Sequence, residues 1–164
     1  MGVLYLIVCG APPAAELPVV VPRLQAAGWQ VCVIATAAAL EFVDREELQE
    51  LTGLSVRCEP RRPGQADPFP PADAVAVAPL TFNSLNKWAV GISDTLALGI
   101  LNELMGAGLP ILAAVWAKEP LRRHPAFAGH VEILASAGVR FLPHGSGPDP
   151  FDWPALEALL AGAK

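Results

Sequence analysis

The densest cluster of polar side chains in an apolar setting lies in the segment PLTFNSLNK, residues 79–87. Its hydroxyl and amide groups come from Thr81, Asn83, Ser84 and Asn86. The segment follows an apolar run and leads into a helical pattern, so we expect these side chains beside the free backbone N–H groups of a helix start. Hydroxyls, amides and free N–H groups together suit a phosphate or a polyhydroxylated chain. Simple helix capping by Thr81 or Asn83 is the alternative.

A second candidate group follows another apolar run, Leu109–Val115. Lys118 comes first, and the triplet Arg122-Arg123-His124 lies just beyond it. An arginine pair beside a histidine matches the forked geometry that binds a carboxylate or a phosphate. A solvated approach to a helix is the alternative, because runs of charged residues usually face water.

Several common catalytic and binding motifs are absent from the sequence. The first predicted loop, Gly10-Ala11-Pro12-Pro13, lacks the G-x-G-x-x-G pattern that lets a dinucleotide pyrophosphate approach the backbone. Neither G-x-x-x-x-G-K-[ST] nor G-x-S-x-G occurs, which excludes a P-loop nucleotide site and the nucleophile elbow of a hydrolase. The histidines His124, His130 and His144 share no metal-ligand spacing, so the sequence predicts no metal site.

The composition predicts one globular domain over residues 1–164. Apolar residues make up 53% of the chain and charged residues 16%, with a mean hydropathy of +0.43, which is the reverse of a disordered sequence. The formal net charge is −5, and only 11 residues are Lys or Arg. Nucleic acid is therefore not an expected partner.

The three cysteines, Cys9, Cys32 and Cys58, form an odd set without a C-x-x-C spacing. Two of them lie inside apolar runs, so we expect small buried side chains rather than disulfides. The apolar N-terminal run stops at Cys9, which is too short for a membrane span, and it lacks the basic flank of a signal peptide. We therefore expect a cytoplasmic protein without a membrane partner.

Alternating strand and helix patterns must position these groups. Apolar runs typical of strands covered on both faces are Val3–Cys9, Trp29–Ala35, Leu54–Cys58, Ala74–Ala78, Leu109–Val115 and Val139–Leu142. Helical patterns span Pro18–Ala27, Asp44–Gly53, Ser93–Met105, Ala126–Ala137 and Pro154–Leu160. Pro22 predicts a kink in the first helix or a late start of it.

This alternation predicts an α/β fold with a single doubly wound parallel sheet, a flavodoxin-like or Rossmann-like three-layer sandwich. Ligands of such sheets bind at the carboxyl ends of the strands, near the point where the strand order reverses. The stretch Pro60–Pro71 is too polar and too rich in proline for a helix or strand, so we expect a surface loop there.

Residues 79–104 resemble the P-[AL]-[ST]-x-N-[ST]-x-x-K-x-A-x-G-x-x-D-[NT]-L segment of flavoproteins related to phosphopantothenoylcysteine decarboxylase and the lantibiotic cysteine decarboxylases. The matching positions are Pro79, Thr81, Asn83, Ser84, Lys87, Ala89, Gly91, Asp94 and Leu96. A second block, Thr36 to Val43, is similar to the T-x-x-A-x-x-F-[IV] block of the same family. The resemblance covers roughly Val3 to Leu142.

The resemblance implies an FMN-binding sheet assembled as a homotrimer or a multiple of trimers such as a dodecamer, with the flavin at a subunit boundary. The cofactor-binding residues that it implies are Gly10, Ala11, Thr36, Phe42, Pro79, Thr81, Phe82, Asn83, Ser84, Asn86, Lys87 and Asp94. Gly10 and Ala11 would approach the ribityl and phosphate groups, and Phe42 would lie near the ring. A chain with a net charge of −5 must neutralise a dianionic phosphate locally, with N–H and hydroxyl donors.

The catalytic positions of that family are replaced here. Glu41 stands where the decarboxylases have a histidine, and residues 113–120 lack the Met and Asn of their P-x-M-N-x-x-M-W substrate clamp. Residues 143–148 contain no cysteine to match the flap of the coenzyme A branch. Ala11 stands where the family usually has a serine, so one hydroxyl donor is lost.

These features predict an FMN-dependent redox enzyme that acts on a small anionic substrate. A non-catalytic flavin-binding or assembly subunit is one alternative, and a site for another phosphorylated ligand is a second. A third is oxidative decarboxylation of a cysteine-type substrate with Glu41 as the catalytic base, although Glu41 also suits a solvent-facing helix. For Trp88, stacking on the flavin, a place at the trimer interface and core packing all stay open.

Overall fold

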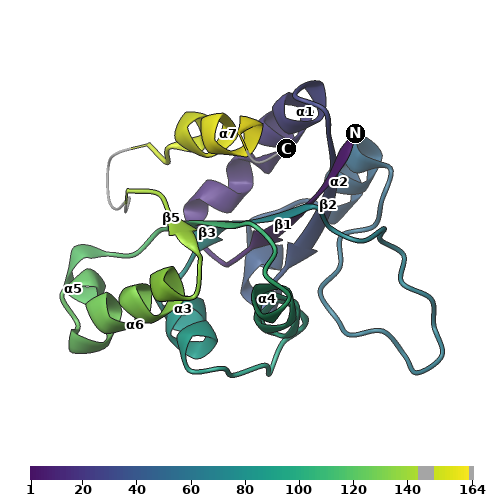
Figure 1. Cartoon of the computed structure of the whole chain (residues 1–164). Helices are drawn as coiled ribbons and strands as arrows, with labels where there is room; N and C mark the ends of the chain where they lie inside the picture. Colours follow the sequence, from purple (N-terminus) through teal and green to yellow (C-terminus); the bar gives the residue numbers. More distant parts are fainter. Residues whose placement is uncertain (144–149, 163–164) are drawn as a thin grey trace.

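In a computed structural model, described for residues 1–143 and 150–162, the chain forms a five-stranded sheet (Figure 1). The strands are β1 (Gly2–Val8), β2 (Trp29–Ala35), β3 (Ala74–Leu80), β4 (Ile111–Val115) and β5 (Arg140–Phe141). Their spatial order is β2-β1-β3-β4-β5, and every neighbouring pair is parallel. The predicted doubly wound α/β fold is therefore confirmed.

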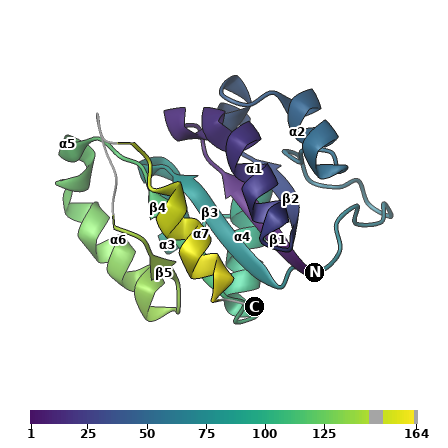
Figure 2. The ribbon, with the colours of Figure 1, turned by 90° about the horizontal axis from the view of Figure 1, so that it is seen from above.

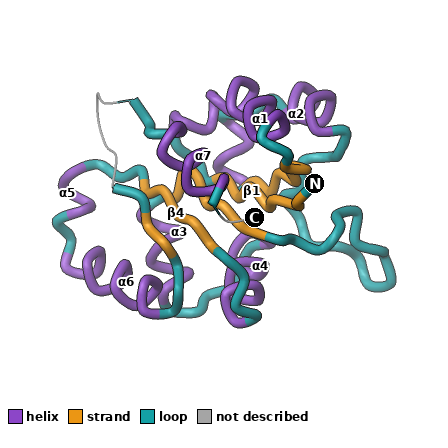
Figure 3. The backbone as a smooth tube through the Cα atoms, turned by 45° about the horizontal axis from the view of Figure 1, so that its top comes forward, coloured by secondary structure: helices purple, strands orange, loops and turns teal. Residues whose placement is uncertain are grey.

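Helices cover both faces of the sheet (Figures 1 and 2). One face carries α1 (Leu17–Ala26), α2 (Arg45–Thr52) and α7 (Trp153–Ala161). The other carries α3 (Phe82–Ala89), α4 (Leu96–Gly106), α5 (Glu119–Arg122) and α6 (Pro125–Ser136), so the strands form the middle layer (Figure 3). Two short 3₁₀ helices, η1 (Pro12–Glu16) and η2 (Ala37–Glu41), follow β1 and β2. Within the described ranges, no helix combines the length and apolarity needed to cross a bilayer.

Side chains of β1 enter two separate cores in alternation. Leu4, Leu6 and Val8 point into the core beneath α1 and α7, whereas Tyr5 and Ile7 point into the core beneath α3, α4 and α6. All five are buried. Because both faces of the strand are covered, its sequence shows no alternation of apolar and polar residues.

Polar caps determine where the helices begin. Asp44 Oδ1 accepts hydrogen bonds from two N–H groups of α2 at 2.9 and 3.1 Å, and Gly53 ends the helix with a φ of 71°. The helix predicted between these two residues is therefore confirmed. Thr95 caps α4 in the same way, so α4 begins at Leu96 rather than at the predicted Ser93.

The strand predicted at Leu54–Cys58 and the late start predicted for the first helix are wrong, whereas the kink at Pro22, the other alternative, stays a prediction. Leu54–Cys58 is not a strand, because in the described part of the chain it meets the sheet only through a single bridge between Arg57 and Ile34. The Arg57 side chain forms an ion pair with Asp67 in the following loop, and the backbone after Arg57 makes no further bridge to β2 within the described residues. Pro22 does not delay α1, which begins at Leu17 and continues past Pro22. Burial of the apolar face of α1 outweighs the one hydrogen bond that the proline removes.

The connection between α2 and β3 ends in a long loop, residues 59–73, which contains no helix or strand. This agrees with the surface loop predicted at Pro60–Pro71. The loop stands away from the sheet on the side of α4 (Figure 1).

Candidate functional site

The strand order reverses between β1 and β3, and the loops that follow these strands lie side by side. The N–H of Cys9 donates to the carbonyl of Pro79 at 3.0 Å, and the N–H of Thr36 donates to the carbonyl of Val8 at 2.9 Å. These bonds bring the ends of β1, β2 and β3 together at one edge of the sheet. The polar segment found in the sequence therefore follows a strand end at the place where ligands of such sheets bind.

Gly10 allows the loop after β1 to approach the loop after β2. A Cβ atom on Gly10 would lie 2.6 Å from the Cβ of Ala38 and 2.8 Å from its carbonyl carbon. Backbone atoms cannot move aside as a flexible side chain can, so the close approach requires glycine. Ala38 is two residues beyond Thr36, and the predicted site residues Gly10 and Thr36 are thus brought together.

Two threonines begin helices at this edge. Thr36 Oγ1 accepts a hydrogen bond from the N–H of Ala39 at 3.3 Å, and Thr81 Oγ1 accepts one from the N–H of Ser84 at 3.4 Å. The hydroxyls of Thr81 and Ser84 are also 3.3 Å apart. Capping is therefore one role of Thr81. It leaves the first N–H groups of α3 without an intrahelical acceptor, at the positive end of the helix dipole.

A buried thiol lies beside this threonine–serine pair. Cys9 is 1% exposed, and its sulfur faces the hydroxyls of Ser84 and Thr81 and the N–H of Thr81, which favour the thiolate. Burial raises the pKa of Cys9, and the hydrogen bonds offset only part of that rise. The thiol is therefore neutral near pH 7 and acts as a packing partner. The sequence analysis placed Cys9 only in a buried strand. Its position directly before the predicted loop at Gly10 indicates that it lies near the candidate site.

Three predicted site residues are exposed beyond the strand ends. Asn83 lies in the first turn of α3, and its side chain makes no hydrogen bond within residues 1–143 and 150–162. Glu41 ends η2, and Phe42 follows it with 37% of its surface exposed. Ala11 and Pro79 are buried, so they offer mainly backbone atoms.

Phe82 and Asn86 turn toward α6. The ring of Phe82 packs against the rings of His124 and Phe127, with centroids 5.4 and 6.5 Å apart. Asn86 Oδ1 lies 2.7 Å from His130 Nδ1. These contacts fasten α3 to α6, and a direct cofactor contact of either residue stays a prediction.

Lys87 and Asp94 bind each other. Lys87 Nζ lies 2.5 Å from Asp94 Oδ2, which ties α3 to the segment before α4. The neighbouring Trp88 is 1% exposed in the core beneath α3, α4 and α6. Of the three roles left open for Trp88, core packing is the one that this burial supports.

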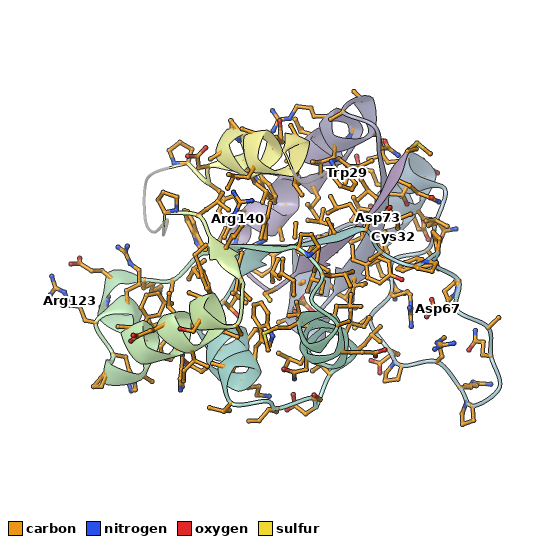
Figure 4. The ribbon with its side chains drawn as sticks, in the orientation of Figure 1. Trp29, Cys32, Asp67, Asp73, Arg123 and Arg140 are labelled. Atoms are coloured by element: carbon orange, nitrogen blue, oxygen red, sulfur yellow. The ribbon has the colours of Figure 1, made fainter. Side chains whose placement is uncertain are left out.

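The arginine–histidine triplet does not converge on one point. Arg123 forms an ion pair with Glu119 on its own helix, and Figure 4 shows it pointing away from the body of the protein. His124 Nδ1 accepts a hydrogen bond from the N–H of Ala126 at 3.1 Å and so caps α6. These contacts match the solvated alternative better than a carboxylate clamp.

Two sequence predictions, on His144 and on the missing flap cysteine, fall on residues outside the described ranges. These residues are 144–148, where the flap cysteine of the related family is missing. Among the described residues, no group of three or more His, Cys, Asp or Glu side chains is arranged to hold a metal ion. The absence of a metal site stays a sequence-based prediction.

The buried thiol of Cys32, on β2, links the stability of the fold to pH. Burial raises the pKa of Cys32 to about 11 from 9.0, with Asp67 adding to the rise and Arg57 opposing it. Because the folded state favours the protonated thiol, the stabilisation is complete below pH 9 and is lost as the pH rises toward 11. The shift corresponds to about 3 kcal/mol. We expect urea titrations to show a steeper alkaline loss of unfolding free energy for the wild type than for Cys32→Ala. Parallel curves would contradict the shift.

The parallel sheet with helices on both faces defines a doubly wound α/β protein, and its polar strand-end loops lie where the strand order reverses. The chain belongs to the Flavoprotein family, whose family model matches residues 3–156. A curated relative, a cysteine/cysteine sulfinic acid decarboxylase from an unknown prokaryotic organism, is 33% identical over 76 residues. The match covers 46% of this chain and 20% of the relative, so the chain spans about a fifth of that protein's length.

Solved structures share the fold over their whole length. The FMN-dependent cysteine decarboxylase SpaF is 25% identical, with 99% of this chain and 97% of that chain covered and a TM-score of 0.82. The FMN-dependent cysteine decarboxylase TvaF from thioviridamide biosynthesis is 24% identical, with 100% and 99% covered and a TM-score of 0.80. A mutant PPC decarboxylase complexed with pantothenoylaminoethenethiol is 18% identical, with 98% and 96% covered and a TM-score of 0.80. The similarity to the last two structures, at 24% and 18% identity, establishes the fold alone.

Proposed function

We propose that this chain binds FMN at the edge formed by the loops after β1, β2 and β3, and uses the flavin to oxidise a small anionic substrate. The observation that carries the proposal is the contact of Gly10 with Ala38, which gathers the three loops beside Thr81. Membership of the Flavoprotein family and the likeness to FMN-dependent decarboxylases support the choice of cofactor. The sequence resemblance further supports a homotrimer or dodecamer, which sedimentation would measure.

The groups at this edge fit the phosphate end of FMN. The first two N–H groups of α3 have no intrahelical acceptor, and the hydroxyls of Thr81 and Ser84 belong to the same turn. The hydroxyl of Thr36 begins η2 at the neighbouring strand end. Such donors stabilise a dianion without a cationic side chain, which suits an acidic chain. Gly10 allows the loop after β1 to pack against Ala38 and so keeps the first two loops together. The exposed ring of Phe42 is available to cover a flat ring system.

Bound FMN supplies a two-electron acceptor. The residues of this chain would bind and orient it, with Asn83 offering an amide that is committed to no other described residue. Glu41 is an exposed carboxylate that follows the same edge, and it is the candidate to accept a proton from the substrate. Its replacement of the decarboxylase histidine changes the charge of the base, which favours a reaction other than that of the decarboxylases.

Oxidative decarboxylation is the second candidate function. It is supported by SpaF, an FMN-dependent cysteine decarboxylase with 25% identity over nearly the full chain. FMN-loaded protein would be mixed with L-cysteine or a cysteine-ended peptide without oxygen, and flavin absorbance and released CO₂ would be followed. Loss of flavin absorbance together with release of CO₂ would indicate decarboxylation. Loss of flavin absorbance without release of CO₂, caused by these or other small anionic thiols and acids, would support the redox proposal. No bleaching with any of them would favour the non-catalytic flavin-binding subunit.

Asn83→Ala tests the flavin edge directly. We expect at least about a tenfold loss of FMN affinity, because one amide hydrogen bond to a charged or polar ligand is worth about 1.5 kcal/mol. Stability in urea should stay unchanged, since the amide binds no described residue. Gln49→Ala, which removes another exposed amide on α2, is the control and should bind FMN normally. Wild-type protein that shows no absorbance near 450 nm (roughly the flavin band) after loading would contradict the proposal.

A further inference from the structure

A cavity lies away from the flavin edge, between the 59–73 loop and α4. Its volume is about 680 Å³, within the range of small-molecule sites. Figure 4 shows Asp67 on this loop, whereas Arg123 lies at the opposite end of the molecule. The cavity shares one residue with the cofactor-binding set that the resemblance implies, Asp94, which is paired with Lys87, and the residues proposed for the flavin edge do not line it.

The cavity is held open by contacts between the loop and β1. The Tyr5 hydroxyl donates to the carbonyl of Pro70 at 2.9 Å, and its ring packs edge-on against Phe69 with centroids 5.8 Å apart. Asp73 Oδ2 accepts a hydrogen bond from the N–H of Val3 at 2.7 Å. A loop anchored in this way presents a preformed wall, which lowers the entropy cost of binding a ligand.

The loop wall carries more cations than carboxylates. Arg57 Nη1 lies 3.1 Å from Asp67 Oδ1, and the Arg57 side chain is 8% exposed. The guanidinium carbon of Arg57 lies 5.3 Å from the centroid of the Phe69 ring. Arg61 Nε lies 3.4 Å from the other oxygen of the same Asp67. Arg62 forms no ion pair with any described residue. One carboxylate is thus shared by two of the three guanidinium groups of this wall, in a chain whose net charge is −5.

The opposite wall, on α4, is mainly apolar. Leu96, Ile100 and Leu104 are spaced four residues apart, are half-buried and line the cavity. Asp94 is neutralised by its lysine partner. Among the described residues that line the cavity, Glu103 is the one carboxylate that forms no ion pair. The two walls therefore differ in character, one cationic and one apolar.

We propose that this cavity binds an amphipathic anion. Its carboxylate, phosphate or sulfonate group lies between Arg61 and Arg62, whose planar guanidinium groups bind such oxygens in pairs. Its apolar body covers the stripe of Leu96, Ile100 and Leu104, because removing that surface from water is favourable. The site is separate from the flavin edge and does not rest on the proposed function.

The test uses anilinonaphthalene sulfonate, a dye with one anionic group on an apolar body. Its binding is measured by calorimetry, with the chain both loaded with FMN and free of it. We expect one saturable site per chain in both forms, and at least tenfold weaker binding of the neutral analogue N-phenyl-naphthylamine. Equal binding of the neutral dye, or no saturable binding of the anionic one, would overturn the proposal.

Matched variants locate the site. Arg61→Gln/Arg62→Gln should weaken dye binding at least tenfold, and Glu103→Gln should strengthen it about threefold by removing the opposing charge. Arg23→Gln/Arg123→Gln makes the same change in net charge outside the cavity, at two exposed ion pairs, and should bind within twofold of the wild type. An equal loss in this control would contradict the assignment.

FMN affinity separates the cavity from the flavin edge. Arg61→Gln/Arg62→Gln should leave FMN affinity unchanged. A parallel loss of FMN and dye would mean that the cavity is itself the flavin site, which would overturn a separate anion site. Failure of wild-type protein to bind FMN would remove the proposed function, while the dye titration of flavin-free protein would still decide this inference.

Discussion

Gly10→Ala is expected to reduce FMN affinity by at least about 30-fold and to lower the free energy of unfolding by about 1–3 kcal/mol, the usual cost of overpacking. The added Cβ would lie 2.6 Å from the Cβ of Ala38, and 2.8 and 2.9 Å from its carbonyl carbon and oxygen. No real Cβ contact is that short, so the loops after β1 and β2 must separate. The separation would move the loop that carries Thr36 away from the loop that carries Gly10, and so would disturb the proposed site. Flavin titration and urea unfolding measure the two effects.

Gly129→Ala is the matched control for this prediction. Gly129 lies inside α6, and a Cβ on it would have no neighbour within 4 Å. Alanine there should raise the free energy of unfolding by up to about 1 kcal/mol, because alanine favours the helix over glycine. FMN affinity should not change. If Gly10→Ala bound FMN as tightly as Gly129→Ala does, the contact with Ala38 would have no part in the site.

Trp88→Ala is expected to cost about 3–5 kcal/mol of stability, the largest loss for a single side chain in α3. Trp88 is fully buried in the core that joins α3, α4 and α6, so its removal leaves a cavity that the helices cannot fill. Since α3 carries Thr81 and Ser84 at its start, FMN affinity should fall as well. Urea unfolding and flavin titration, at a temperature where the variant is folded, would measure both.

Trp88→Phe distinguishes packing from hydrogen bonding. The indole N–H of Trp88 has no acceptor among the described residues, so phenylalanine loses only part of the ring volume. Stability should fall by about 1–2 kcal/mol, and FMN affinity should stay close to the wild-type value. A loss of flavin in Trp88→Phe as large as in Trp88→Ala would point instead to a direct role of the indole in the site.

Local features of the molecule could be predicted from the sequence. Asp44 and Gly53 bound α2 because capping depends on residues only three or four positions apart. The polar segment after β3 could be found because its hydroxyls and amides interrupt an apolar pattern. The family resemblance, which rests on the spacing of these residues, is confirmed by the match over residues 3–156.

Other features depend on partners far away in the chain. Leu54–Cys58 has the composition of a strand, but it meets β2 at one bridge, and the side chain of Arg57 pairs with Asp67 in the following loop. Phe82 and Asn86 look like ligand-binding residues by position, yet α6 engages both of them. Spacing indicates which face of a helix a residue occupies and does not indicate what that face meets.

The order of strands and helices, the covered sheet and the place of the polar segment directly after a strand follow from the amino-acid sequence by itself, because propensities and caps act over a few residues. The tertiary structure alone decided that Gly10 meets Ala38, that Cys9 lies beside Thr81 and Ser84, and that an arginine-lined cavity opens beside α4. Each of these joins segments separated by many residues. Such contacts are determined by how whole elements pack, which local sequence patterns do not encode.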